Sequence, residues 1–250
     1  MRILVCNDDG IGSAGLRLLV EAARALADDV WVVAPDRKWT AAGHQLSFDR
    51  DLTLTRVADR TYACSGAPAD CVVAAMTVLF DAASRPDLVL SGVNDKRNVG
   101  EDLAYSGTMA IAREAVFWGV PAIALSGEGW GAEIDAQAPQ LSRLLAAAWD
   151  TRADWAGDGR WLSINLPATL PAPVEEARVG RDKIATACDV VERNDDRIVY
   201  RIRRGRPGTR APGDENDRID AGCVAIVQHR WHCEDAVPKR VLEALTKAAG

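Results

Sequence analysis

The sequence lacks any run of about 20 uncharged apolar residues, the length that spans a lipid bilayer. Residues 1–8 reach an arginine and then an aspartate too early to contain the apolar core of a secretory signal peptide. The six cysteines include no Cys-x-x-Cys pair. In a chain of this size without an export signal, we expect them to be reduced and mostly buried. These absences predict a cytoplasmic protein that is not bound to a membrane.

Positive charge is also scarce. The 250 residues carry 30 Lys and Arg against 36 Asp and Glu, which gives a net charge of −6. This balance lacks the basic surface of a protein that binds nucleic acid stably or adheres to anionic lipid. If the substrate is a phosphate ester, a local feature must attract it, and a bound cation is the simplest candidate.

What the sequence does contain is a regular alternation of apolar runs and amphipathic segments. Strands that alternate with helices of 10–15 residues form right-handed βαβ units, and such sheets carry their sites at the carboxyl ends of the strands. We therefore predict an α/β fold with a Rossmann-like, mainly parallel sheet covered by helices on both faces. The predicted strands are 3–6, 30–34, 52–55, 88–90, 122–125 and 161–166, and the predicted helices are 15–27, 68–79, 109–118 and 134–149.

The pattern changes after residue 170. This change sets a predicted boundary between a catalytic domain, residues 1–170, and a C-terminal extension, residues 171–250. In the extension, residues 189–204 predict a β-hairpin that turns at Asn194–Asp196. A charged, Gly- and Pro-rich segment at 203–220 predicts a mobile loop, followed by a strand at 224–227 and a helix at 238–249.

Two adjacent carboxylates, Asp8 and Asp9, end the first predicted strand. The next six residues fit the G-x-G-x-x-G pattern, which makes a dinucleotide-binding oxidoreductase one reading. The two carboxylates argue against this reading, because they lie where the pyrophosphate of a dinucleotide would bind. Like charges about 4 Å apart repel by about 1–4 kcal/mol. A hard divalent cation removes the conflict. The remaining alternative is that one aspartate only caps the first helix.

Two later loops carry groups suited to such a site. Asn94 and Asn98 follow the strand at 88–90, and their amide oxygens can complete a metal shell without adding negative charge. Ser106, Gly107 and Thr108 precede a predicted helix, where hydroxyls and free backbone N–H groups form an anion site. A simple N-cap at Ser106 or Thr108 is an equally good interpretation.

These segments together resemble the SurE (survival protein E) family of metal-dependent 5′/3′-nucleotidases. Asn-Asp-Asp-Gly at 7–10, Ser-Gly-Val-Asn at 91–94, Tyr-Ser-Gly-Thr at 105–108 and Gly-Val-Pro-Ala-Ile-Ala-Leu-Ser at 119–126 occur in the family's order and spacing. The resemblance covers residues 1–167 well. It implies a phosphomonoesterase with a Rossmann-like domain and a C-terminal hairpin exchanged between the subunits of a homodimer or homotetramer. It also implies a divalent metal ion, for which we expect one Mg²⁺ or Mn²⁺ per subunit, on Asp8, Asp9, Thr40 and Asn94.

The predicted catalytic residues are Asp8, Asp9 and His44. A loop histidine can protonate a leaving alkoxide, although His44, where the family more often has Asn, can equally be a surface residue. Phosphate contacts are predicted for Asn98, Lys96 and the segment 106–108. A dinucleotide-binding oxidoreductase and a family member that binds a phosphorylated ligand without turnover remain the alternatives.

Two departures from the family pattern bear on the substrate. Residues 39–41 read Trp-Thr-Ala in place of Arg-Ser-Gly, so Thr40 keeps the hydroxyl while the glycine is lost. Trp39 could stack on a base. Lys96 and Arg97 add two cations beside Asn94, which favours a compact or multiply anionic phosphoester over a plain nucleoside monophosphate. Solvent-exposed side chains that merely offset neighbouring acids are the alternative.

Overall fold

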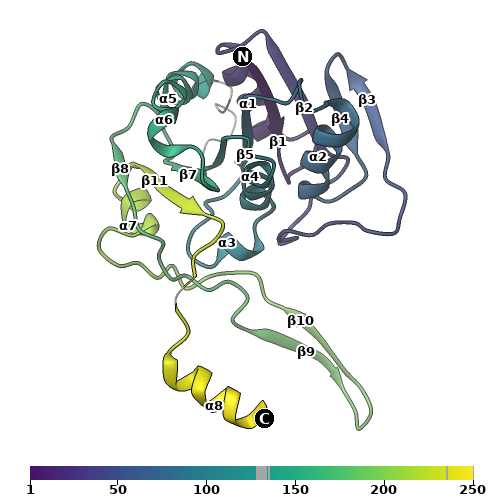
Figure 1. Cartoon of the computed structure of the whole chain (residues 1–250), viewed down its shortest axis with the longest axis vertical. Coiled ribbons are helices and arrows are strands. Elements are labelled where there is room, and N and C mark those ends of the chain that lie inside the picture. Colours follow the sequence, from purple (N-terminus) through teal and green to yellow (C-terminus); the bar gives the residue numbers. More distant parts are fainter. Residues whose placement is uncertain (128–133, 135, 235, 250) are drawn as a thin grey trace.

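The computed structural model describes residues 1–127, 134, 136–234 and 236–249, and its elements are arranged as Figure 1 shows. The strands are β1 Arg2–Cys6, β2 Asp29–Pro35, β3 Leu54–Ala58, β4 Thr61–Cys64, β5 Leu88–Asn94, β6 Ala122–Gly127, β7 Arg160–Leu166, β8 Val174–Glu176, β9 Cys188–Arg193, β10 Ile198–Ile202 and β11 Val224–Arg230. The helices are α1 Ala14–Arg24, α2 Pro68–Ala74, the π-helical turn η1 Ala75–Leu79, α3 Asp102–Tyr105, α4 Gly107–Phe117, α5 Ala138–Asp150, α6 Arg152–Trp155, α7 Glu215–Asp220 and α8 Lys239–Ala249.

The main sheet confirms the predicted α/β class. Its nine strands follow the order β3-β4-β2-β1-β5-β6-β7-β11-β8. The strands from β4 to β7 in this order pair in parallel, whereas β3 and β11 run antiparallel to β4 and β7. The chain adds β2 and β4 on one side of β1 and then returns to place β5 on the other. Because open α/β sheets bind ligands at the carboxyl edge where the strand order reverses, the β1–β5 boundary is the expected position of the site.

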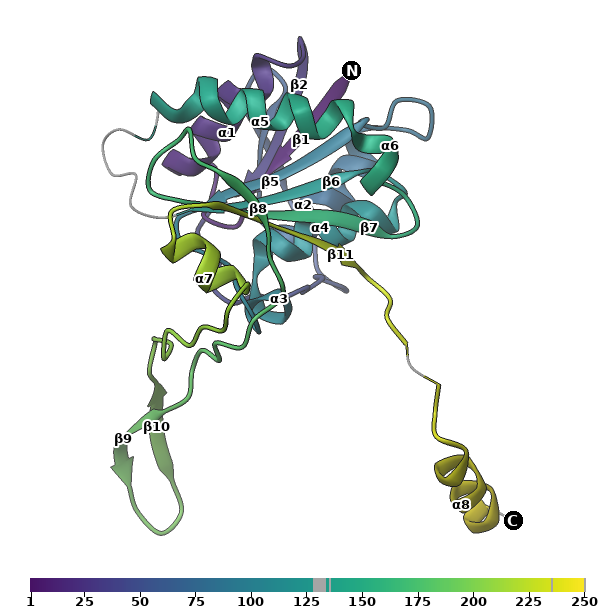
Figure 2. The same ribbon diagram turned by 90° about the vertical axis from the view of Figure 1, so that its left-hand side faces the viewer.

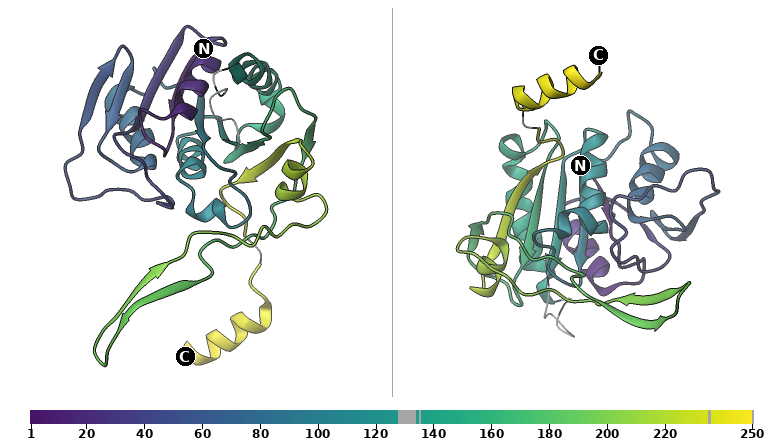
Figure 3. Two further views of the ribbon diagram at one scale, coloured as in Figure 1. Left: turned by 180° about the vertical axis from the view of Figure 1, so that it is seen from behind. Right: turned by 90° about the horizontal axis from the view of Figure 1, so that it is seen from below.

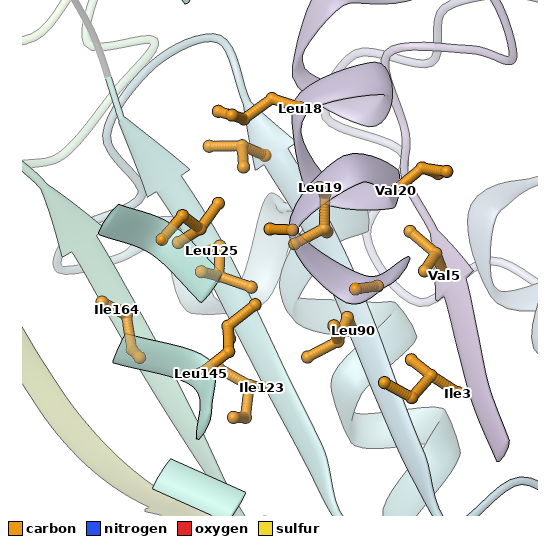
Figure 4. Close-up of a cluster of buried hydrophobic side chains, with 14 of the residues drawn as sticks. Ile3, Val5, Leu18, Leu19, Val20, Leu90, Ile123, Leu125, Leu145 and Ile164 are labelled. Carbon is orange, nitrogen blue, oxygen red and sulfur yellow. The ribbon is translucent and has the colours of Figure 1, made fainter. Parts of the chain in front are cut away.

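Side chains of the central strands fill two cores, one on each face of the sheet. In β1, Ile3 and Val5 belong to the cluster formed with α1 and α5, and Leu4 and Cys6 to the cluster formed with α2 and α4. Figure 2 shows these helix pairs on opposite faces of the sheet, and Figure 4 shows the first cluster in detail. The continuous apolar run in β1 is explained by this arrangement, because successive side chains of a strand point to opposite faces.

Two of the predicted helices differ in extent from the observed ones. The segment predicted as one helix at 68–79 changes at residue 75 from α2 to the wider turn η1. The helix predicted at 134–149 begins only at Ala138, and its predicted second residue, Asp135, lies outside the described residues. The short strands β4 and β8 were not predicted, because they lack a long apolar run of their own.

The prediction of a mobile loop at 203–220 is wrong for residues 215–220, which form a helix. The segment contains α7, whose N-cap residue Asp214 accepts a hydrogen bond from the backbone N–H of Asp217 at 2.8 Å. Arg206 lies 2.6 Å from a carboxylate oxygen of the buried Asp102. Arg206 is therefore paired with the main domain, and residues 215–220 are helical. Most of residues 203–212 are exposed and belong to no helix or strand, so the mobility of that part stays a prediction.

The predicted C-terminal hairpin is confirmed. Strands β9 and β10 form a separate antiparallel pair, and Figure 3 shows this hairpin and α8 projecting away from the rest of the molecule. In contrast, β8 and β11 extend the main sheet, and the domain boundary at residue 170 stays a prediction. Within the described ranges, every helix is too short or too polar to cross a bilayer.

Helix α1 packs closely against the end of β5 at Gly15. A Cβ atom at Gly15 would lie 1.9 Å from the carbonyl oxygen of Val93, whereas one at Gly12 would have no neighbour within 4 Å. We expect Gly15→Ala to push α1 outward and lower the free energy of unfolding by about 1–3 kcal/mol. Urea denaturation measures this change, and Gly12→Ala is the matched control. Equal stability of the two variants would contradict the close approach.

Candidate active site

Asp8 and Asp9 leave β1 at the point where the strand order reverses. Asp8 is buried, and one of its carboxylate oxygens accepts a hydrogen bond from Oγ1 of Thr108 at 2.7 Å. Burial, the largest cause, raises the pKa of Asp8 from 3.8 to about 6; the charge of Asp9 adds to this shift and the bond from Thr108 opposes it. The pair of carboxylates thus lies against the start of α4. The surroundings of Asp8 disfavour its negative charge.

The turn that carries the aspartates is held by Asn7. Its side-chain amide donates to the carbonyl of Gly10 at 3.1 Å and to Oγ of Ser13 at 2.7 Å, and its Oδ1 accepts from the N–H of Gly10 at 3.2 Å. Ser13 in turn caps α1. The glycine string at 10–15 therefore serves the turn and the packing of α1, rather than forming a free pyrophosphate cradle.

The loop between β2 and β3 lies beside the two aspartates. The backbone N–H of Trp39 donates to the carbonyl of Asp8 at 2.8 Å, which places the exposed Thr40 next to the pair. Lys38, from the same loop, forms an ion pair with Asp9 and a second with Asp95, whose carboxylate lies 2.7 Å from its Nζ. Sequence reasoning missed Lys38, although its place two residues before Thr40 was a usable signal.

The loop after β5 contributes unequally to the site. The amide nitrogen of Asn94 donates to the carbonyl of Lys96 at 2.6 Å, which leaves the amide oxygen of Asn94 as its possible metal ligand. Asn98 is buried, and its amide nitrogen donates to Oγ of Ser126 at 2.8 Å. These contacts show that Asn98 fastens the loop to β6, while its predicted contact with phosphate stays a prediction.

Of the two cations that the sequence places beside Asn94, Arg97 is paired with residues of α7. Nη1 of Arg97 lies 2.9 Å from Oδ1 of Asp220 and 3.0 Å from Oδ1 of Asn216, both in α7. Arg97 therefore fixes the loop to the C-terminal part of the chain. Lys96 remains exposed at the surface. The sequence could not reveal this difference, because α7 lies more than a hundred residues further along the chain.

The start of α4 carries a capping serine and backbone N–H groups of the kind that bind anions. Oγ of Ser106 accepts from the backbone N–H of Met109 at 3.2 Å, so Ser106 is the N-cap, while its hydroxyl proton remains available to a ligand. The N–H groups of Gly107 and Thr108 have no acceptor within the helix. A Cβ at Gly107 would lie 2.7 Å from Cβ of Asp8. Only glycine therefore allows the helix to start this close to the aspartate.

His44 is bound on both sides of its ring. Nε2 lies 2.7 Å from the buried Glu114, and Nε of Arg113 donates to Nδ1 at 3.0 Å. Because arginine can only donate, Nδ1 is the acceptor and Nε2–H donates to the carboxylate. These contacts favour a positioning role, in which His44 fixes the 36–53 loop to α4, over the predicted general-acid role. Glu114 and Arg113 lie inside a predicted helix, where no local sequence signal marks them.

The residues at this edge fit a hard divalent cation. Asp8 and Asp9 supply two carboxylates, and the ammonium of Lys38 in contact with Asp9 marks a position that accepts positive charge. Thr40 carries a hydroxyl one residue beyond the Trp39 N–H that bonds the carbonyl of Asp8, and Asn94 carries an amide oxygen at the end of β5. In the part of the chain that the structure describes, no three His, Cys, Asp or Glu side chains form a metal-binding group. Two carboxylates completed by neutral oxygens and water suit Mg²⁺ or Mn²⁺ better than zinc.

The fold and the site define a Rossmann-like α/β protein with a carboxylate pair and a helix N-terminus at its switch point. Residues 3–187 match the family model described as Survival protein SurE, and the chain belongs to this family. It is 35% identical to the 5′-nucleotidase SurE of Paramagnetospirillum magneticum, over 99% of this chain and 95% of the relative. It is 38% identical to the 5′-nucleotidase SurE of Brucella canis, over 90% of this chain and 91% of the relative. The crystal structure of the SurE protein from Aquifex aeolicus superposes over 100% of both chains, with a TM-score of 0.81 and 26% identity.

The raised pKa of Asp8 predicts how the metal-free protein responds to pH. Well below pH 3.8, the ordinary pKa of this carboxyl, both the folded and the unfolded chain are protonated at this position, so the group has no effect. As the pH rises toward 6, the unfolded chain ionises first, and stability falls; the full penalty persists above pH 6. A pKa difference of this size corresponds to about 3 kcal/mol.

We therefore expect Asp8→Asn, in the presence of a chelator, to raise the free energy of unfolding at pH 8 by up to about 3 kcal/mol and to change it little at pH 4. The asparagine keeps an oxygen that accepts from Thr108. Denaturant titrations at both pH values provide the measurement, with the exposed Asp150→Asn as control. The expectation is wrong if Asp8→Asn is no more stable than the wild type at pH 8.

Proposed function

We propose that this chain is a metal-dependent phosphomonoesterase that hydrolyses nucleoside monophosphates to a nucleoside and phosphate. The observation that carries the proposal is the contact of the buried Asp8 with Thr108 at 2.7 Å. This contact puts the two carboxylates, the proposed cation ligands, beside the start of α4, the proposed phosphate site. A phosphate placed there meets a cation and helix N–H groups together. Membership of the SurE family and the name 5′-nucleotidase carried by its relatives support this substrate class.

For the cofactor we infer one Mg²⁺ or Mn²⁺ ion per subunit, held by Asp8, Asp9, Thr40 and Asn94. Such an ion, when bound, polarises the phosphoryl group and offsets the charge that develops on it. The fold prepares this set by bringing the carboxyl ends of β1 and β5 together. Thr108 orients Asp8 through its hydroxyl, and the N–H of Asp95 holds Asp9 at 3.1 Å.

The residues at the start of α4 bind and orient the phosphate. Ser106 can donate its hydroxyl proton, and Gly107 and Thr108 can donate their backbone N–H groups, to phosphate oxygens. Water is the proposed nucleophile, with Asp8 or Asp9 as the group that accepts its proton. His44 contributes by holding the loop that carries Thr40 against α4 through Glu114.

A phosphate-release assay with Asp9→Asn tests this proposal. We expect the wild type to release phosphate from 5′- and 3′-nucleoside monophosphates with Mg²⁺ or Mn²⁺ and to stop when a chelator is added. Removal of one carboxylate ligand should lower kcat/KM by about a hundredfold or more, because even outer-shell changes cost about 10–100-fold. Asp150→Asn should behave as the wild type.

Wild-type turnover by Asp9→Asn at limiting Mg²⁺ would contradict the carboxylate pair as the metal site. Binding of nucleotides without phosphate release under any metal would favour the non-catalytic alternative. A parallel titration with NAD(P) tests the oxidoreductase reading.

We also propose that the protein assembles as a homodimer or homotetramer through its C-terminal hairpin. An isolated two-stranded hairpin is marginally stable in water. Here Val190 lies opposite Tyr200, and the two side chains are 54% and 60% exposed. Val191, Ile198 and Ile202 are also more than half exposed. A partner subunit that exchanges the same hairpin, as the family resemblance implies, would cover this apolar surface.

Disruption of the hairpin should therefore yield monomers. We expect both the deletion of residues 190–203 and the double substitution Val190→Asp with Tyr200→Asp to do so, because a buried charge in the interface is unpaired. Multi-angle light scattering at micromolar concentration gives the mass of each species. Asp195→Ser, at the tip of the hairpin, is the control that should leave assembly intact. A monomeric wild type would defeat the proposal.

A further inference from the structure

Lys38 forms an ion-paired bridge between an inner and an outer carboxylate of the site. Its Nζ contacts Oδ1 of Asp9 and lies 2.7 Å from Oδ2 of Asp95. The Asp9 side chain is 7% exposed, whereas that of Asp95 is 60% exposed and that of Lys38 46%. The ammonium group therefore reaches from solvent to the nearly buried member of the carboxylate pair.

Both oxygens of Asp9 are engaged in this arrangement. Oδ1 is paired with Lys38, and Oδ2 accepts the backbone N–H of Asp95 at 3.1 Å. A divalent ion that approaches Oδ1 meets a positive charge already in contact with it. Like charges at such a separation repel, so the ion and the ammonium group cannot both occupy that side of Asp9 without cost.

We propose that Lys38 is a built-in counter-ion, which occupies the cation position on Asp9 in the metal-free protein and competes with the divalent ion for it. The inference rests on the proposed function, because it requires the metal to bind at Asp8 and Asp9. When the ion binds, Lys38 moves outward and keeps only its pair with Asp95. Its long, half-exposed side chain makes this movement inexpensive.

The competition has two linked consequences. In the metal-free protein, Lys38 offsets the repulsion between Asp8 and Asp9 and so supports the folded site. For the same reason it lowers the apparent affinity for metal, since only molecules in which Asp9 is released can bind the ion. The released ammonium group, held at Asp95, then adds a positive charge at the rim of the site where an anionic substrate enters.

Calorimetric titration of Mn²⁺ into the metal-free, full-length protein tests the proposal. We expect Lys38→Gln to bind Mn²⁺ about tenfold more tightly than the wild type, because the competitor is absent. Lys38→Met keeps most of the side chain without its charge and should behave in the same way. Lys38→Arg retains a cation and should stay near the wild type. Lys247→Gln, on α8, is the control for loss of a lysine charge elsewhere.

Thermal unfolding supplies a second measurement that does not depend on turnover. Metal-free Lys38→Gln should have a lower Tm than the wild type, and its Tm should rise more when Mn²⁺ is added, so that the two proteins converge at saturation. Equal Mn²⁺ affinity in the wild type and Lys38→Gln would overturn the role of Lys38 while leaving the proposed function intact. Absence of Mn²⁺ binding in both proteins would overturn the metal site and this inference together.

Discussion

The burial of one carboxylate directly beside another is the constraint on which the site depends. Desolvation and the neighbouring Asp9 both disfavour the charge on Asp8, and the hydroxyl of Thr108 together with the charge of Lys38 compensates only in part. Such a carboxylate pair stabilises the fold no more than neutral, hydrogen-bonded side chains would, and its burial lowers the free energy of unfolding. Its presence at the switch point of the sheet is explained by a function that requires concentrated negative charge, and the binding of a divalent cation is such a function.

The backbone around the pair is arranged to permit this burial. Gly107 lets α4 start in contact with Asp8, so that helix N–H groups lie next to the carboxylate instead of a side chain. Gly15 lets α1 pack against the end of β5, which keeps the loop after β5 close to the loop after β1. Partly buried ion pairs then tie this region to the C-terminal part of the chain, through Arg97 to α7 and through Arg206 to Asp102. The C-terminal residues therefore belong to the architecture of the site as well as to the proposed subunit contact.

The sequence predicts the features that depend on local pattern and leaves out those that depend on distant contacts. Buried strands such as β1 and β6 are short uninterrupted apolar runs, and helices such as α1 show the periodicity of one core face, so the sequence predicts both within a few residues. The role of Ser106 as a cap was also predictable, because capping is local. The partners of His44 and Arg97 were not, since they lie 69 to 123 residues away in the chain. A charged or polar loop residue has the same sequence signature whether it meets substrate, solvent or a helix folded back onto it.

The contacts of Lys96 and Arg97 bear on which substrate the site would favour. The predicted preference for compact or multiply anionic phosphoesters requires the cations at 96 and 97 to face the phosphate, whereas solvent exposure of both is the alternative interpretation. Arg97 is instead paired with Asp220 and Asn216, so its charge is already balanced by α7. Lys96 stays as one exposed charge beside Asp95, which itself is paired with Lys38. The local excess of positive charge that would draw a more anionic substrate is therefore much smaller than the loop sequence suggests. The charges at 96 and 97 therefore give little reason to expect a substrate different from the nucleotides named for the relatives of this chain.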